Sequence, residues 1–191
     1  TSWYEEQLTV TEMTKRYASL ITRMDAAIGR LLRELERLGL RENTIVVFAS
    51  DNGAAVQAPI EILNSNGSFR GRKDNLYEGW IRVPLIINCP GRVKKQALDH
   101  PVYFPDMMPT LAALAGNAKL PQGVDGMDIS PLFFGKKFKT DERLMYLVFP
   151  GKQISACKGN WKIIQPKLNS PFDLYDLEKD PFETTDVAKK Y

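Results

Sequence analysis

Cysteine and histidine are both scarce in this chain, which has only Cys89, Cys157 and His100 among its 191 residues. The two cysteines form no metal-binding motif, and they are too few for a disulfide framework. No apolar run comes close to the roughly 20 residues that span a bilayer, so no membrane span is expected. The net charge of +3 is small and no nucleic-acid-binding motif accompanies it, so nucleic acid is not an expected partner.

The first recognisable element is a long amphipathic helix that leads into a strand. Apolar residues recur at steps of three and four between residues 13 and 38, and Gly39 provides the stop. Residues 44–49 are apolar and rich in β-branched side chains, which predicts a strand covered on both faces. A helix joined to a buried strand by a short link is typical of a doubly wound α/β sheet.

Asp51, Asn52 and Gly53 follow directly at the end of this predicted strand. Ligands of open α/β sheets bind just beyond the carboxyl ends of the strands. The Asp51 carboxylate beside the Asn52 carboxamide is therefore suited to form half of a site for a hard cation such as calcium. Asn-Gly is also a strong hairpin signal, so these three residues alone do not separate a cation site from a plain turn.

An irregular, basic segment connects this strand to a second one. Residues 54–79 show little periodic pattern and contain Arg70, Arg72 and Lys73 between two glycines. Irregular loops of this length in a compact domain are often functional. Residues 83–88 then predict another buried strand, with Pro84 at its start because an interior proline would remove a ladder hydrogen bond.

The pattern changes near residue 128. Residues 106–116 predict a short buried helix, and the stretch that follows is rich in glycine, proline and lysine. Short connections then favour an antiparallel sheet built from four strand-like runs, at residues 144–149, 153–157, 161–165 and 172–177. We therefore predict an α/β unit in residues 1–128 and a small antiparallel α+β subdomain in residues 129–191, ending in a polar helix.

Short motifs spread along the chain resemble, in their order, those of the sulfatase family within the alkaline-phosphatase-like superfamily. They are Asp51-Asn52-Gly53, Arg70-Gly71-Arg72-Lys73, Tyr77-Glu78-Gly79, Asp106 with Pro109-Thr110, Gly159-Asn160-Trp161-Lys162, Asp173-Leu174-Tyr175-Asp176-Leu177 and Asp180-Pro181-Phe182-Glu183. The resemblance implies the C-terminal part of the sulfatase fold. That part comprises a mixed, mostly parallel sheet with flanking helices, followed by a small antiparallel subdomain.

The resemblance also implies roles for three residues. Asp51 and Asn52 match the family pair that completes the coordination of one divalent cation, usually calcium, with magnesium as an alternative. Lys73 matches the lysine that contacts the oxygens of the sulfate ester beside that cation. A fixed cation and an ammonium group stabilise the charge of the transition state. Superfamily members with zinc place histidine where this chain has Asn52, and a carboxamide oxygen suits calcium better than zinc.

Other parts of the family's machinery are missing from this sequence. The family's nucleophile is a formylglycine made within a Cys/Ser-x-Pro-x-Arg motif, which neither Cys89 nor Cys157 fits. We therefore interpret the chain as a C-terminal fragment, inactive alone, whose catalytic domain continues upstream. Two ligands cannot hold calcium tightly, so weak binding is expected. We interpret His100 as a surface or packing residue, and Trp80, where the family has a second glycine, as a pocket wall or a packing residue.

The expected function is hydrolysis of a sulfate ester in a sulfated small molecule or glycan, by a protein that includes the missing N-terminal part of the domain. Two alternatives stay open. One is a hydrolase of phosphate diesters or phosphonate monoesters with the same architecture, and the other is a non-catalytic sulfatase-like protein. The family's locations are the periplasm, the cell exterior and the lysosome, and the sequence does not choose among them. Such a fragment is expected to expose a sheet edge and apolar surface.

Overall fold

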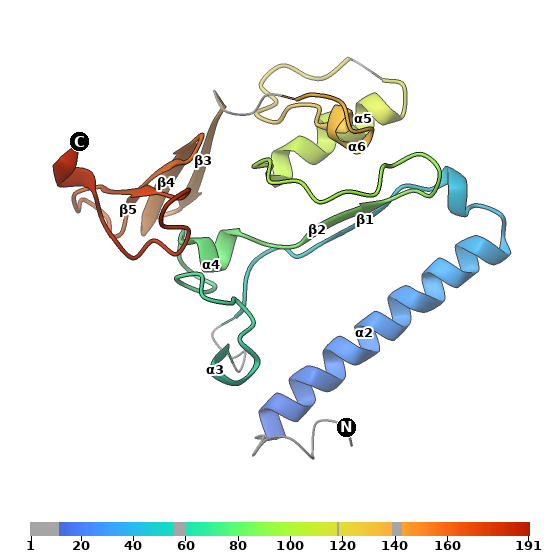
Figure 1. Cartoon of the computed structure of the whole chain (residues 1–191), viewed down its shortest axis with the longest axis horizontal. Helices are drawn as coiled ribbons and strands as arrows, with labels where there is room; N and C mark the ends of the chain where they lie inside the picture. Colours follow the sequence, from blue (N-terminus) through green and yellow to red (C-terminus); the bar gives the residue numbers. More distant parts are fainter. Residues whose placement is uncertain (1–11, 56–59, 118, 139–142) are drawn as a thin grey trace.

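The structure, a computed structural model, describes residues 12–55, 60–117, 119–138 and 143–191. Its helices are α2 (Glu12–Arg37), α3 (Ile60–Leu63), α4 (Glu78–Ile81), α5 (Met107–Leu114) and α6 (Ser130–Phe133). Its strands are β1 (Val46–Ala49), β2 (Leu85–Asn88), β3 (Leu144–Phe149), β4 (Gln153–Lys158), β5 (Trp161–Gln165) and β6 (Asp173–Asp176). The four-stranded sheet lies to one side, and α2, α5 and α6 lie around β1 and β2 (Figure 1).

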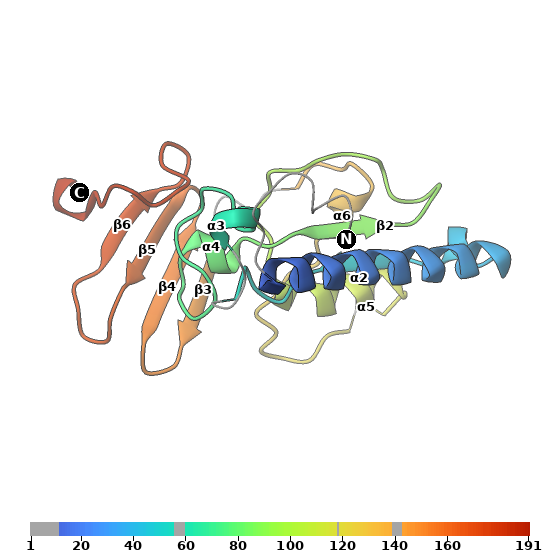
Figure 2. The same cartoon turned by 90° about the horizontal axis from the view of Figure 1, so that it is seen from below.

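The predicted long helix is confirmed as α2, but most of its apolar stripe is exposed. Thr14 and Ala18 are its buried residues, whereas Leu20 is 64% and Leu31 57% exposed. Figure 2 shows the helix running along one side of the molecule. An amphipathic helix buries such a stripe against a core in a complete domain, so this stripe is an unpartnered surface here. No described helix is long and apolar enough to cross a membrane.

The two central strands lie where the sequence predicts them, and β2 begins directly after Pro84. They form an antiparallel pair in which Val46 lies opposite Asn88. The expected sheet is mixed, and this pair is an antiparallel part of it; no parallel pair occurs among the described strands. The expectation of strands buried on both faces is wrong, since Val47 and Ile86 are exposed. The physical reason is that the covering layer is incomplete: Ile87 packs against a hydrophobic cluster, whereas Ile86 lies on the other face, where the described residues form no such cluster.

A hydrophobic cluster covers one face of this pair. Ile129, Leu132 and Phe133 are buried at its centre, and Ile87 of β2 and Leu114 of α5 pack against them. The predicted domain boundary after residue 128 therefore falls inside a packed cluster that continues to Phe138. The four-stranded sheet begins only at β3, so the change from one packing unit to the next comes after that residue.

The predicted antiparallel sheet is confirmed, with strand order β3-β4-β5-β6 and boundaries within a residue of the expected runs. One face of this sheet packs against the segment that includes α4. Leu76, Tyr77, Ile164 and Tyr175 are buried between them. The predicted polar helix at the C-terminus is wrong, because the chain forms only a 3₁₀ turn at Ala188–Lys190 there.

Candidate functional site

The Asp51-Asn52-Gly53 segment forms a turn directly after β1, as the sequence predicts. The Ser50 hydroxyl donates to the carbonyl oxygen of Asn52 at 2.8 Å, and the Asn52 Nδ2 donates to the carbonyl of Gly53 at 3.0 Å. These bonds hold the turn without using the Asn52 Oδ1. The Asp51 side chain is exposed and Asn52 is half-buried. The turn thus presents one carboxylate and one carboxamide oxygen at the strand end.

Two glycines bring a second turn into close contact with this one. The Gly53 amide donates to the carbonyl of Trp80 at 2.7 Å, and a Cβ atom on Gly53 would lie 1.9 Å from the carbonyl oxygen of Gly79. A Cβ atom on Gly79 would in turn lie 2.4 Å from the carbonyl oxygen of Gly71. Three backbone segments therefore meet at distances that only glycine permits.

Lys73 lies in the third of these segments, beside the Asp51 turn. Its amide donates to the carbonyl of Ala54 at 2.9 Å. Ala54 is two residues beyond Asn52, so this bond holds the Lys73 backbone beside the turn. The Lys73 side chain is exposed. The structure therefore brings the three predicted site residues to one place, although Asp51 and Lys73 are 22 positions apart in the numbering.

A buried ionic cluster anchors the same region to the four-stranded sheet. Nζ of Lys162 lies 2.9 Å from the Glu78 carboxylate and 2.7 Å from that of Glu183. The second oxygen of Glu183 accepts a hydrogen bond from the Glu78 amide at 2.7 Å. Burial raises the pKa of Glu183, and the charge of Lys162 opposes that shift. The cluster joins α4, β5 and the C-terminal segment, far apart in sequence.

Arg70 links the Lys73 segment to the same sheet. Its Nη1 donates at 2.9 Å to the Tyr175 hydroxyl and at 2.9 Å to the carbonyl of Glu183. The guanidinium also lies over the Tyr77 ring, 4.0 Å from its centre. Burial raises the pKa of Tyr175, which keeps its hydroxyl protonated. The basic segment is therefore only partly a solvated loop, because Arg70 ties it down while Lys73 is left exposed.

Sequence reasoning assigned no role to Lys162, although the sequence holds a signal for it. In β5 the side chains of Lys162 and Ile164 are buried, whereas Trp161 and Ile163 are exposed. A lysine that alternates onto the apolar face of a strand requires a buried partner of opposite charge. Such a position predicts an ion pair, although the sequence does not reveal that Glu78 and Glu183 supply it.

Trp80 packs rather than opening toward solvent. Its ring lies 5.5 Å from that of Phe149, measured between centroids, so it fills the junction between α4 and the end of β3. Its Nε1 is buried and has no hydrogen-bond partner among the described residues. Of the two roles left open by the sequence, this contact fits packing.

The donor set at the turn suits a hard cation but is incomplete. Asp51 and Asn52 offer oxygen ligands, which calcium and magnesium prefer. Among the described residues, no three His, Cys, Asp or Glu side chains gather into a possible metal site. Calcium takes six or more ligands, so these two residues fit the ion only as part of a larger set.

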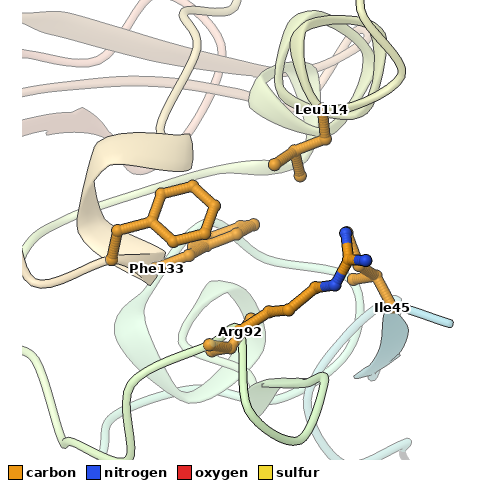
Figure 3. A pocket seen from close by; sticks show the side chains of 6 residues that line it. Ile45, Arg92, Leu114 and Phe133 are labelled. Carbon is orange, nitrogen blue, oxygen red and sulfur yellow. The ribbon is translucent and has the colours of Figure 1, made fainter. Parts of the chain in front are cut away.

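The structure also has an apolar pocket of about 390 Å³, lined by Ile45, Arg92, Val93, Leu114, Phe133 and Phe134. Figure 3 shows the Arg92 side chain reaching along it toward Ile45, with Leu114 and Phe133 on other walls. Ile45 precedes β1, whereas Asp51 follows that strand. The pocket therefore lies at the opposite end of β1 from the predicted site residues.

The chain matches two protein-family models that overlap. Residues 2–117 match the model described as Sulfatase, and residues 67–191 match that of N-sulphoglucosamine sulphohydrolase, C-terminal. Each model covers more than half of the chain. Together they span every element that contributes to the Asp51 turn, the Lys73 segment and the ionic cluster.

Individual proteins show the same similarity. Human steryl-sulfatase is 38% identical over 68% of this chain and 23% of its own length. The N-acetylgalactosamine-6-O-sulfatase of Bacteroides thetaiotaomicron is 31% identical over 90% of this chain and 38% of its own length. The crystal structure of Ps i-CgsB in complex with k-i-k-neocarrahexaose superposes with a TM-score of 0.80 and 30% identity, over 95% of this chain and 40% of that one. The chain thus spans well under half the length of these relatives.

Proposed function

This chain belongs to the sulfatase family, and we propose that it forms the C-terminal part of a domain that hydrolyses sulfate esters with a divalent cation. The observation that carries the proposal is the contact between the Asp51 turn and the Lys73 segment through Ala54. It brings the backbone segment that carries Lys73 against the turn that carries the Asp51 carboxylate and the Asn52 carboxamide. The two oxygen-bearing groups suit a cation, and the ammonium group of Lys73 suits an anionic ester next to it.

In this proposal Asp51 and Asn52 hold calcium, with magnesium as an alternative, and Lys73 contacts the sulfate oxygens. The cation, when bound, supplies positive charge beside the ester. Lys73 adds a second positive charge on a long side chain, suited to binding an anion as a point charge. Both charges oppose the build-up of negative charge on the sulfate oxygens as the ester bond breaks.

The remaining machinery lies outside these residues. Neither Cys89 nor Cys157 stands in a Cys/Ser-x-Pro-x-Arg motif, and both are buried. We propose that a formylglycine nucleophile and the other cation ligands come from sequence upstream of Thr1, and that the chain alone has no turnover. The substrate is a sulfated glycan or small molecule, and the protein works in the periplasm, outside the cell or in the lysosome.

The proposal is tested on this chain joined to its upstream sequence and produced together with a formylglycine-generating enzyme. Turnover of an aryl sulfate is compared with turnover of an aryl phosphate diester, with calcium and after chelation. We expect calcium-dependent preference for the sulfate, and a loss of about 10²–10³-fold in kcat for Lys73→Ala, as for other groups that stabilise an oxyanion. Asp51→Ala should weaken the calcium dependence.

Lys95→Ala is the matched control, because Lys95 is also exposed but follows the far end of β2. It should retain full turnover. Preference for the diester would assign the protein to the neighbouring hydrolases of the superfamily. Absence of turnover on both esters, with the nucleophile motif intact and modified, would contradict the proposed activity on aryl sulfates.

A further inference from the structure

We propose that Asn66 is a positioning residue whose carboxamide fixes the Lys73 segment against the Asp51 turn; this rests on the proposed function. Its Oδ1 accepts a hydrogen bond from the Ala54 amide at 2.8 Å, and its Nδ2 donates to the carbonyl of Gly71 at 3.0 Å. Both polar ends of one half-buried side chain are therefore used. One end holds the turn and the other holds the lysine segment.

These bonds close a hydrogen-bonded ring. Ala54 donates its amide to Asn66 and accepts from the Lys73 amide at 2.9 Å through its carbonyl. Gly71, two residues before Lys73, completes the ring through its carbonyl. The ring leaves the Lys73 backbone little freedom to move away from Ala54. It does not include the exposed Lys73 side chain, which is left to bind an anion.

The local backbone presents Asn66 to both partners. The amide of Gly67 donates to the carbonyl of Asn64 at 2.8 Å, and that of Phe69 donates to the carbonyl of Asn66 at 3.2 Å. Gly71 has φ +85°, and a Cβ atom there would lie 2.3 Å from Oδ1 of Asn75. Gly71 therefore takes a conformation that other residues avoid, and its carbonyl points to the Asn66 amide.

The chemical reason for such a ring is pre-organisation. Lysine has a long, flexible side chain, and ordering a mobile loop during the reaction would add to the barrier. A loop already held in the productive position avoids that cost. Asparagine suits the role because its short side chain carries one acceptor and one donor group. Alanine offers neither, and aspartate offers only the acceptor.

Asn66 also begins an Asn-Gly-Ser triplet that fits the N-glycosylation sequon. Ser68→Ala is therefore a matched control, since it removes the sequon but leaves the Asn66 amide in place. Ser68 is exposed, and its side chain forms no hydrogen bond with the described part of the chain. Any effect of a glycan would appear in both variants, whereas the positioning role affects only Asn66→Ala.

The first experiment measures amide hydrogen exchange in the 191-residue chain. Asn66→Ala should speed exchange at Ala54 and Lys73 by about tenfold or more, through local opening. Asn66→Asp should keep Ala54 protected while Lys73 exchanges faster. Ser68→Ala should match the parent chain, and unchanged protection at Ile163 in β5 would show that the fold is intact. Unchanged exchange at Lys73 in Asn66→Ala would overturn the inference.

The second experiment measures kcat in the longer, catalytically competent protein, as a double-mutant cycle. If Asn66 acts through Lys73, Asn66→Ala lowers kcat about tenfold in the parent and has little further effect in the Lys73→Ala background. Equal losses in both backgrounds would contradict a positioning role. If the longer protein hydrolyses no sulfate ester, the proposed function fails, while hydrogen exchange still decides whether Asn66 holds the loop.

Discussion

At the scale of single residues, the order of short motifs in the sequence identified the candidate site. The structure shows which hydrogen bonds hold its segments together. Asp51 and Asn52 stand out in the sequence because they form a short motif at a strand end, and Lys73 because it belongs to a short basic motif between two glycines. Asn66 has no such signal, since its partners are backbone groups of Ala54 and Gly71. Any residue type supplies such groups, so no pattern of side chains predicts the ring.

Removing the cation of the buried cluster should be costly. In Lys162→Met the carboxylates of Glu78 and Glu183 lose their shared ammonium group, although a methionine fits the space. Breaking a buried ion pair on one side costs about 3–5 kcal/mol, so urea denaturation should show a loss of that size. Lys179→Met is the control, because Lys179 pairs with Asp176 while 78% exposed, and it should leave the midpoint almost unchanged.

The Cys157 thiol should be inert in the folded chain. Burial raises its pKa to about 11 from the ordinary value of 9.0. The folded state therefore holds the thiol proton more tightly than the unfolded state, and this contribution to stability is lost as the pH rises from about 9 to about 11. A thiol-specific reagent at pH 8 should label Cys157 only after denaturation. Rapid labelling of the folded chain would show that the side chain is accessible.

At the scale of elements, the sequence predicted strands better than their partners. The runs that became β3, β4, β5 and β6 are joined by short connections that leave no room for a helical crossover, so their order and antiparallel pairing follow from local signals. The run of β1 predicted a strand but not the direction of its neighbour. That direction depends on where the chain returns for β2 after a long connection that contains α3 and α4, and no local pattern in the sequence predicts it.

The contact between the Asp51 turn and α4 should tolerate no side chain at Gly53. In Gly53→Ala the new Cβ atom would meet the carbonyl of Gly79 at 1.9 Å, and backbone must shift to relieve the clash. We expect a loss of about 1–3 kcal/mol in urea denaturation, as for other overpacked sites. Hydrogen exchange at the Lys73 amide should also become faster, because that amide bonds to the carbonyl of Ala54, the residue next to Gly53.

Gly29→Ala is the control for Gly53→Ala, and it should stabilise the chain in urea denaturation. Gly29 lies within α2, and a Cβ atom there would meet only the flexible end of the Arg33 side chain, at 3.4 Å. Alanine in place of a helical glycine stabilises by about 0.5–1 kcal/mol. An equal destabilisation in both variants would show that the chain is sensitive to any added methyl group, and not to the contact at Gly53.

At the scale of the whole molecule, the chain has two packing units, joined by buried charges and an apolar cluster, and an apolar surface that no described residue covers. The ionic cluster and Arg70 join the four-stranded sheet to the segment that carries Lys73. On the other side, exposed apolar residues lie on α2 and on the β1–β2 pair, among them Leu20, Leu31 and Ile86. The family relatives are more than twice as long as their matched regions, which fits a domain whose remainder covers this surface.

The exposed stripe of α2 should make the isolated chain self-associate. Leu20 and Leu31 are 11 residues apart, which places them about 20° from one another around a helix, on one face. Their burial in an assembly removes apolar area from water. Sedimentation velocity should therefore show a sedimentation coefficient that rises with protein concentration in the micromolar range. The double change Leu20→Glu and Leu31→Glu should reduce that rise.

Net charge must be separated from the loss of apolar surface, because repulsion alone also keeps chains apart. The pair Arg30→Gln and Arg33→Gln on the same helix lowers the net charge from +3 by two units, as the two leucine changes do. Both arginines are exposed, so the apolar stripe stays intact. This control should associate like the parent chain. If it dissociates as fully as the leucine variant, charge governs association and the stripe of α2 is not the contact surface.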